Sequence, residues 1–546
     1  MAESTIQDAD IPEPRVNEIR RDEIHYDKIR CWIDDCMSSH LGNCTKRVEL
    51  PVHHLNLIDC ESRCIITAKP SFRYSALSYV WGLSPDGTGT IRGNGLPSSI
   101  PKTIEDAMVV NGQLGIRYLW VDRYCILDSS DHKAEQIGNM HNIYRGAEVT
   151  IIAAAGEDPH YGLPGVHQRR PRKSQPAFDF KGRRLVFTGR SLPLHLQYSK
   201  WDTRAWTLQE GLLSRRRLVF TDEQVYFECQ NSQYCEMVDL SAGREKEILG
   251  MGYTRFEAMS LDPLIRHDYL QWSIWNVIRK YTSRQLTHDS DVLNAMLGIL
   301  AYFEEQRPQE FRHMWGLPII LKDGKCLHEV LIHSLMWTGK DPARRRPEFP
   351  SWSWIGWTGK ARMCEGGVDI IPVEIQFELR DGSFISSSDE LKDMQQYKVA
   401  SQNISHFLII KAPTVNIRIC PGQQSGLNPP RASLDSRWEA TLVHPDEGRL
   451  AQPLPSDQSN VNIGRFFNNE SGHDNAQLDK KFSSSSVWKA ILLGHGPLTK
   501  NSKLPERILV VHKVGTWWER VGIAEFNCSK EVMHDHVKSY ESFRLG

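Results

Sequence analysis

Residues 100–156 read IPKTIEDAMVVNGQLGIRYLWVDRYCILDSSDHKAEQIGNMHNIYRGAEVTIIAAAG, and this stretch decides the fold. Apolar residues at helical spacing, begun by a proline and ended by a glycine, predict a helix over residues 101–114. A continuous apolar run predicts a strand over residues 117–126, and a second helical pattern follows at residues 130–144. Another apolar run predicts a strand over residues 148–155. The stretch therefore alternates between helix and strand, as parallel sheets do.

The same alternation extends in both directions from this stretch. Upstream, residues 74–82 read YSALSYVWG and predict a strand that ends in aromatic residues and a glycine. Downstream, a helix around residues 203–213 precedes a hairpin at residues 218–229. Strands this apolar are buried on both faces, so we expect an α/β module whose parallel sheet is covered by helices on both sides. Its first three strands should be neighbours in that sheet.

Composition divides the chain into four parts. We expect a weakly ordered polar lead over residues 1–45, the α/β module over residues 46–235, a mainly helical region over residues 240–345 and a β-rich region over residues 346–546. Within the last part, residues 421–486 are polar and rich in proline and serine. That composition predicts a disordered insertion that stays outside the core of the β-rich region.

The bulk properties are those of an ordinary globular protein. Of the 546 residues, 40% are hydrophobic and 24% are charged, which allows a sizeable core. The formal net charge is −1, so no basic excess indicates a nucleic-acid partner. No apolar stretch approaches the ~20 residues of a membrane helix, and the N-terminus lacks the apolar segment of a signal peptide. We therefore expect a cytoplasmic protein without a membrane span.

The cysteines and histidines form no recognisable metal motif. The 12 cysteines are scattered, and none forms a CxxC pair. His328 and His333 are five residues apart, whereas the HExxH motif needs histidines four apart on a helix. Cys125 could act as a nucleophile with His132 or His141, but the sequence offers no group to orient the base. We expect reduced thiols and no metal site.

Three segments together resemble the heterokaryon-incompatibility (HET) domain family of fungal proteins. They are residues 74–82, residues 100–156 and the run RAWTLQEGLLSRRRLVF at residues 204–220. The family usually has an Asp-x-x-Cys-Ile-Asp-Gln run in its second strand and loop. Here Leu127 follows the isoleucine, Asp128 is displaced by one position and the glutamine is missing. The resemblance implies a role in non-self recognition and programmed cell death.

The resemblance also implies a more distant relation to the Toll/interleukin-receptor (TIR) fold, a flavodoxin-like parallel sheet. Some TIR modules cleave NAD with a glutamate on a helix, in a Trp-x-x-x-Glu segment. WTLQE at residues 206–210 is similar to that segment, so Glu210 is the candidate catalytic residue. In this interpretation NAD is the substrate and no bound cofactor is required.

A small set of residues supplies the chemistry that such a reaction needs. A carboxylate beside the ribose stabilises an oxocarbenium-like state, and aromatic rings hold the nicotinamide. The candidate catalytic carboxylates are Glu210 and Asp122. The candidate nucleotide-binding residues are Tyr79, Trp81, Gly82 and Trp206. We expect Tyr79, Trp81, Asp122 and Glu210 to line one cleft at the carboxyl edge of the sheet, where ligands of open parallel sheets bind.

Other interpretations of the same residues stay open at this point. Trp206 could be a core residue, and Glu210 could pair with Arg204 or Arg215. Asp122 could be a helix cap or an ion-pair partner of Arg123 or Arg145. The module could then act without chemistry, by self-association or by binding a protein partner.

Overall fold

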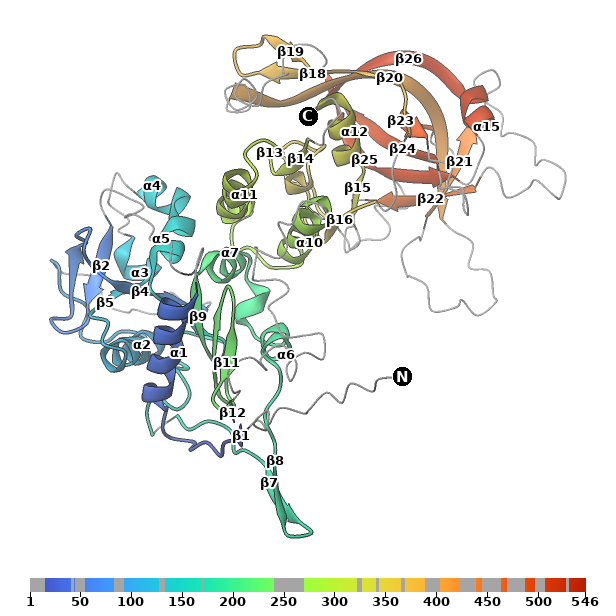
Figure 1. Ribbon diagram of the computed structural model, residues 1–546. Helices are drawn as coiled ribbons and strands as arrows, with labels where there is room; N and C mark the ends of the chain where they lie inside the picture. Colours follow the sequence, from blue (N-terminus) through green and yellow to red (C-terminus); the bar gives the residue numbers. More distant parts are fainter. Residues whose placement is uncertain are drawn as a thin grey trace, which may run out of the picture. The chain divides into compact units, whose positions relative to one another are not determined.

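The computed structural model divides into two compact units, each of which has its own core (Figure 1). The first unit holds Met1–Arg266 with Arg284–Leu286 and Asn294–Ile299, and the second holds the rest of the chain. The structure describes residues 15–40, 44, 55–82, 93–126, 133–168, 170–239, 270–321, 327–339, 343–364, 369–387, 403–421, 438–443, 463–468, 487–495, 506–526 and 530–546.

An eight-stranded mixed sheet organises the first unit, in the order β11-β10-β9-β6-β4-β5-β2-β3. Its strands are β2 (Asn56–Asp59), β3 (Cys64–Thr67), β4 (Tyr74–Ser78), β5 (Tyr118–Trp120), β6 (Thr150–Ala153), β9 (Arg216–Phe220), β10 (Val225–Cys229) and β11 (Gln233–Cys235). Two short ribbons accompany the sheet, β1 (Arg15–Val16) with β12 (Val238–Asp239) and β7 (Ala177–Phe180) with β8 (Arg183–Val186).

The middle of this sheet is parallel, which confirms the predicted neighbouring strands. β4 pairs in parallel with β5 and with β6, and β6 pairs in parallel with β9. Every residue of β4, β6 and β9 is buried, as expected for strands covered on both faces. The chain runs from β4 to β5 on one side and returns to β6 on the other. The strand order therefore reverses at β4.

Helices follow the strands largely where the apolar periodicity predicts them. They are α2 (Lys102–Gln113), α3 (Asp122–Cys125), α4 (Lys133–Gly138), α5 (Met140–Gly146), α6 (Leu192–Gln197), η2 (Trp201–Thr203) and α7 (Ala205–Leu213). Among the described residues of the whole chain, no helix is long and apolar enough to cross a membrane.

The second predicted strand is shorter than the apolar run that predicts it. β5 ends at Trp120, and Asp122 begins the short helix α3. The Asp122 carboxylate accepts a hydrogen bond from the backbone amide of Arg123 at 2.7 Å. A carboxylate in the middle of a buried strand would have no such donor, so the chain leaves the sheet before it. The expectation that Asp122 is embedded in the strand was wrong.

The predicted polar lead contains a helix that packs into the first unit. α1 (Tyr26–Ser39) buries Ile29, Trp32, Ile33 and Cys36. Its apolar residues occupy one narrow stripe, so the average polarity of residues 1–45 hides them. The Trp32 ring stacks on Tyr234 of β11 at 5.9 Å between centroids.

The second unit combines helices with a large antiparallel sheet. Its helices and short ribbons are α10 (Leu270–Thr282), η4 (Asp289–Val292), α11 (Asn294–Gln306, of which the first six residues belong to the first unit), α12 (Leu327–Leu335), η5 (Trp354–Gly356), α15 (Lys530–Asp535), β13 (Phe311–Met314), β14 (Leu317–Ile320), β15 (Trp337–Gly339) and β16 (Ala361–Met363). The sheet contains β17 (Asp369–Ile370), β18 (Glu374–Leu379), β19 (Phe384–Ser386), β20 (Ile404–Pro421), β21 (Trp438–Val443), β22 (Ile463–Asn468), β23 (Val487–His495), β24 (Glu506–Val514), β25 (Trp517–Phe526) and β26 (Val537–Leu545).

Six of these strands close into a ring of antiparallel pairs. β20 pairs with β23, β23 with β24, β24 with β25, β25 with β22, β22 with β21, and β21 again with β20. The apolar core of this unit includes Ile417 of β20, Leu442 of β21 and Val510 of β24. Closure satisfies the backbone groups that an open edge would leave unpaired.

Two strands of this ring lie inside the stretch predicted as a disordered insertion. β21 and β22 fall within residues 421–486, and Ala440 and Leu442 are fully buried. The prediction that the whole stretch stays outside the core was therefore wrong. Each strand has only six residues between long polar segments, so the composition of the stretch conceals it. Residues 422–437, 444–462 and 469–486 lie outside the described residues.

The role of β21 can be tested with Leu442→Ala. Removing a fully buried leucine side chain should lower the free energy of unfolding by about 2–5 kcal/mol, measured by urea-induced unfolding. Val487→Ala on β23 is the control, because Val487 is 48% exposed and its truncation should change stability by less than about 0.5 kcal/mol. Equal effects of the two variants would contradict a structural role for β21.

Candidate functional site

The buried carboxylate of Glu210 lies against the last residue of β4. Ser78 ends that strand and donates a hydrogen bond from Oγ to Glu210 Oε2. The Ser78 hydroxyl also accepts a hydrogen bond from Nε1 of Trp201, at 2.7 Å. Ser78 and Trp201 are fully buried and Glu210 is 5% exposed. This chain of bonds joins the parallel sheet to η2 and α7.

Burial and a neighbouring charge make Glu210 a weaker acid than an ordinary glutamate. Desolvation is the main cause and the negative charge of Asp122 is the second, and together they raise the pKa of Glu210 to about 7. The hydrogen bonds from Ser78 and Tyr144 and the positive charge of Arg204 act in the opposite direction. The carboxyl group is therefore poised to gain or lose a proton near neutral pH.

Asp122 is the second carboxylate at this edge of the sheet. Its Oδ2 accepts a hydrogen bond from Nε1 of Trp81 at 2.8 Å, and its Oδ1 accepts one from the amide of Arg123. Burial raises the pKa of Asp122 to about 6, although the Arg123 amide and the Trp81 indole oppose the shift. Trp81 itself is 37% exposed, so this end of the site reaches the surface.

Tyr79 contributes a buried hydroxyl that is unsatisfied. Its side chain is 3% exposed, and within the part of the chain that the structure describes its hydroxyl has no hydrogen-bond partner. Burial, reinforced by the charge of Asp122, raises the pKa of Tyr79 well above its usual value. A buried hydroxyl without a partner is costly, which marks a place where a ligand can bond.

The contacts of Gly82 and Trp206, two of the candidate nucleotide-binding residues, indicate a structural role for both. Gly82 has a φ of +78°, and a Cβ atom there would lie 2.9 Å from Cδ of Pro159, so the loop needs glycine. Trp206 is partly buried and packs against the core of the first unit. The tryptophan that bonds to Ser78, the partner of Glu210, is instead Trp201.

The arginines proposed as ion-pair partners of Glu210 and Asp122 have other contacts. Arg215 donates to the carbonyl groups of Gly146 and Ala147, at 3.4 and 3.3 Å. The guanidinium of Arg123 lies over the Trp81 ring, 5.1 Å from its centroid. The charge of Arg204, the other arginine proposed for Glu210, acts on both carboxylates and lowers their pKa values.

Several residues of the site could not be selected from the sequence. Ser78, Trp201 and Tyr144 bond to Glu210 or to its partner, and the buried Arg284 adds a positive charge near it. Arg284 itself is held by the Arg204 carbonyl at 3.0 Å and by the carboxylate of Asp202. A polar serine at the carboxyl end of a buried strand is the one sequence signal that could have indicated Ser78.

An open hollow of the first unit lies elsewhere, beside α2. Its lining residues are Lys102, Glu105, Asp106, His167 and Gln168. None of these residues belongs to the predicted cleft. The polar cluster at the carboxyl edge of the sheet is mostly buried, and it reaches the surface at Trp81.

These features define an α/β module with a partly parallel sheet and with a buried glutamate and a half-buried aspartate at its carboxyl edge. The family model for heterokaryon incompatibility protein (HET) matches residues 74–210. The match begins at the first residue of β4 and ends at Glu210, so it includes the carboxyl-edge residues from Ser78 to Glu210. Comparisons with curated proteins and with solved structures gave no match.

Replacing Glu210 by glutamine should stabilise the protein in a pH-dependent way. The folded-state pKa of about 7 lies above the ordinary value of 4.5, so the folded chain keeps a proton that the unfolded chain loses. The wild type therefore loses stability as the pH rises from about 4.5 to about 7, by roughly 3 kcal/mol in all. Glutamine keeps the shape and cannot ionise.

Thermal unfolding of Glu210→Gln and of the wild type at pH 8 and pH 5 measures this effect. The variant should gain most at pH 8 and little at pH 5. Glu61→Gln is the control, because the Glu61 side chain is 71% exposed. A variant that is less stable than the wild type at pH 8 would show that the ionised carboxylate holds the fold together.

Proposed function

We propose that this chain acts in heterokaryon incompatibility, as an effector of programmed cell death in the fungal cytoplasm. The HET match over residues 74–210 supports the role, and the same stretch supplies both carboxylates, Glu210 and Asp122. In this proposal the first unit is the acting module. A protein partner, or contact between copies of the module, triggers it.

We further propose that the module cleaves the nicotinamide–ribose bond of NAD at the edge of the sheet that carries Glu210. The observation that carries this proposal is the carboxyl group of Glu210, whose pKa is raised by burial and by the charge of Asp122, near the unsatisfied hydroxyl of Tyr79. The strand order β5-β4-β6-β9 adds support, because it is the order of the first four strands of flavodoxin-like sheets. Those sheets bind ligands where the order reverses, which here is at β4.

The residues have distinct roles in this reaction. The bond between ribose C1′ and nicotinamide N1 breaks, and its electron pair leaves with the nicotinamide. The ionised Glu210 stabilises the positive charge that develops on the ribose. A water oxygen then bonds to C1′ and releases its proton, which gives ADP-ribose and free nicotinamide. Tyr79 and Asp122 bond to ribose hydroxyls, and the exposed ring of Trp81 holds the nicotinamide.

The pKa of Glu210 predicts how the activity depends on pH. Because the ionised carboxylate does the work, kcat/KM for NAD should rise with pH through about 7 and level off above it. Release of nicotinamide by the purified chain, followed between pH 5.5 and 8.5, measures the profile. Activity that falls as Glu210 ionises would contradict its role as a charge stabiliser.

A second candidate function follows from the burial of Glu210. Its carboxyl group already accepts a hydrogen bond from Ser78 and is 5% exposed, which suits a structural role as well. In that case the module works by assembly without chemistry. The exposed Trp81 would then belong to the contact surface between copies or with a protein partner.

Expression in a fungal cell separates the two functions. We expect the wild type to deplete NAD and kill the cell, and Glu210→Gln to lose both effects at equal abundance and equal assembly. Glu61→Gln is the matched control and should remain toxic, since Glu61 lies on the surface. A Glu210→Gln variant that kills without NAD loss would reject the enzymatic function and favour assembly.

A further inference from the structure

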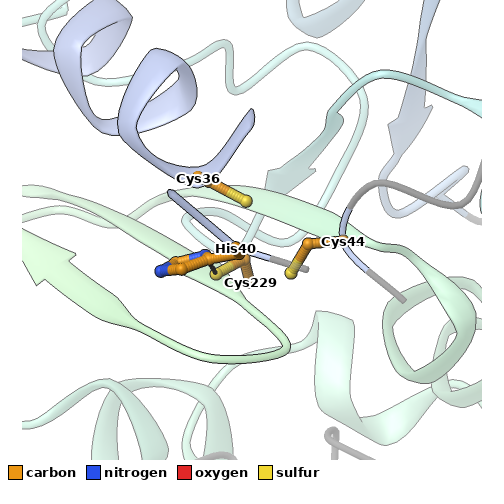
Figure 2. A group of neighbouring side chains, drawn as sticks. All are labelled: Cys36, His40, Cys44 and Cys229. Carbon is orange, nitrogen blue, oxygen red and sulfur yellow. Dashed lines mark hydrogen bonds between the residues drawn. The ribbon is translucent and has the colours of Figure 1, made fainter. Parts of the chain in front are cut away.

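Four potential metal ligands from distant parts of the sequence meet at one place in the first unit. Cys36 lies in the last turn of α1, His40 follows that helix, Cys44 follows it in turn, and Cys229 ends β10. Their ligand atoms all lie within 4.8 Å of one another. Figure 2 shows the three thiol groups and the imidazole ring gathered between α1 and the end of β10.

Three of the cysteines that are scattered along the sequence are thus brought together by the fold at this place. Within the part of the chain that the structure describes, this is the single group of three or more such ligands found together. Cys36, Cys44 and Cys229 are buried and His40 is half-buried. Buried thiols are common as small apolar residues, but three of them around one imidazole are not explained by packing alone.

The spacing of the ligand atoms fits a tetrahedral ion. With Zn–S bonds of about 2.3 Å and Zn–N bonds of about 2.0 Å, tetrahedral geometry places sulfur atoms about 3.8 Å apart and nitrogen about 3.6 Å from sulfur. Nδ1 of His40 lies 3.4 Å from Sγ of Cys229. The upper limit of 4.8 Å for the whole group requires only side-chain rotations to reach the tetrahedral distances.

Hydrogen-bond donors face two of the three sulfur atoms. Cys229 Sγ accepts hydrogen bonds from the backbone amides of Asn231 and Ser232, at 3.4 and 3.2 Å. Cys36 Sγ accepts one from Nε of the buried Arg216 at 3.2 Å. Amide and guanidinium donors aimed at sulfur stabilise thiolates, which are the form that binds metals.

A second contact orients the histidine as metal sites require. Nε2 of His40 lies 3.2 Å from Oγ of Ser232. When Nε2 carries the proton and donates it to this hydroxyl, Nδ1 is left unprotonated and faces Cys229. Ligating histidines are held in this manner by a partner on the opposite ring nitrogen.

We propose that Cys36, His40, Cys44 and Cys229 bind one Zn²⁺ ion in a structural site. Three thiolates and one imidazole are soft ligands that select zinc over magnesium or calcium. The four protein ligands fill the tetrahedral shell, so no position is left for a substrate. The ion therefore stabilises the fold and takes no part in catalysis. This proposal does not depend on the function proposed above.

The position of the site indicates what the ion holds together. Two ligands flank the end of α1, and Cys229 is the last residue of β10, before the turn to β11. Trp32 of α1 packs against Phe227 and Tyr234 of this hairpin, and Tyr234 adds a 2.6 Å hydrogen bond to Asp35. Zinc would fasten the N-terminal helix to the outer strands of the sheet.

Metal analysis of the purified full chain tests the proposal directly. We expect about one zinc ion per chain by mass spectrometry, after expression in zinc-containing medium and extensive dialysis. Cys229→Ser and His40→Ala should each lower the zinc content by roughly tenfold or more under the same conditions. Cys31→Ser is the matched control, because Cys31 lies on the same helix but is exposed. It should keep the full content.

Two further measurements keep the test decisive if a variant fails to fold. Replacing zinc by Co²⁺ in the wild type should give the visible bands of a tetrahedral ion and a near-ultraviolet thiolate-to-cobalt band. Cys229→His keeps four ligands and should retain zinc. With Co²⁺ it should keep the visible bands, and its thiolate-to-cobalt band should be weaker. Chelation of the metal from the wild type should lower its Tm.

The opposing outcomes are equally defined. A wild-type chain without zinc and without a cobalt spectrum would overturn the proposal. So would zinc that remains in the Cys229→Ser and His40→Ala variants at the level of the Cys31→Ser control. Thiol titration under denaturing, non-reducing conditions adds a third readout. If two of the three thiols of the cluster are missing in the freshly purified chain, the result would indicate a disulfide in place of the metal site.

Discussion

The hydrogen bond between Ser78 and Glu210 is the constraint on which the first unit depends. It connects the central strand β4 to α7, and Trp201 adds η2 to the same cluster. A buried carboxyl group is costly unless it is bonded, so this contact leaves little freedom in how α7 lies against the sheet. Arg284, from beyond the HET match, is held by the neighbouring Asp202 and extends the same polar cluster.

The same constraint gives the carboxyl edge its electrostatic character. Burial and the charge of Asp122 raise the pKa of Glu210 to about 7, and burial raises the pKa of Asp122 to about 6. The positive charge of Arg204 opposes both shifts without cancelling them. The polar cluster lowers the stability of the fold at this place, which is the pattern expected of a functional site.

Local patterns predict the parallel core well and the periphery poorly. The runs that became β4, β5 and β6 are short, apolar and separated by helical periodicity, so their pairing follows from general rules. β5 ends early because Asp122 needs a donor outside the sheet. α1, β21 and β22 escaped detection because their few apolar residues lie within polar surroundings, and only contacts with distant residues such as Tyr234 stabilise them.

Contacts between distant residues also explain why the two polar clusters differ in how far they could be foreseen. Glu210, Asp122, Tyr79 and Trp81 stand in segments that resemble a known family, whereas Ser78 and Trp201 are joined to them only by the fold. Cys36 and Cys229 are brought together by the pairing of α1 with β10, which no spacing in the sequence announces. The cluster of cysteines and His40 lies on α1 and β10, whereas the cluster around the carboxylates lies on β4, α3 and α7, so separate elements carry the two clusters. The cysteine cluster can thus support the N-terminal helix without taking part in the chemistry of the carboxylates.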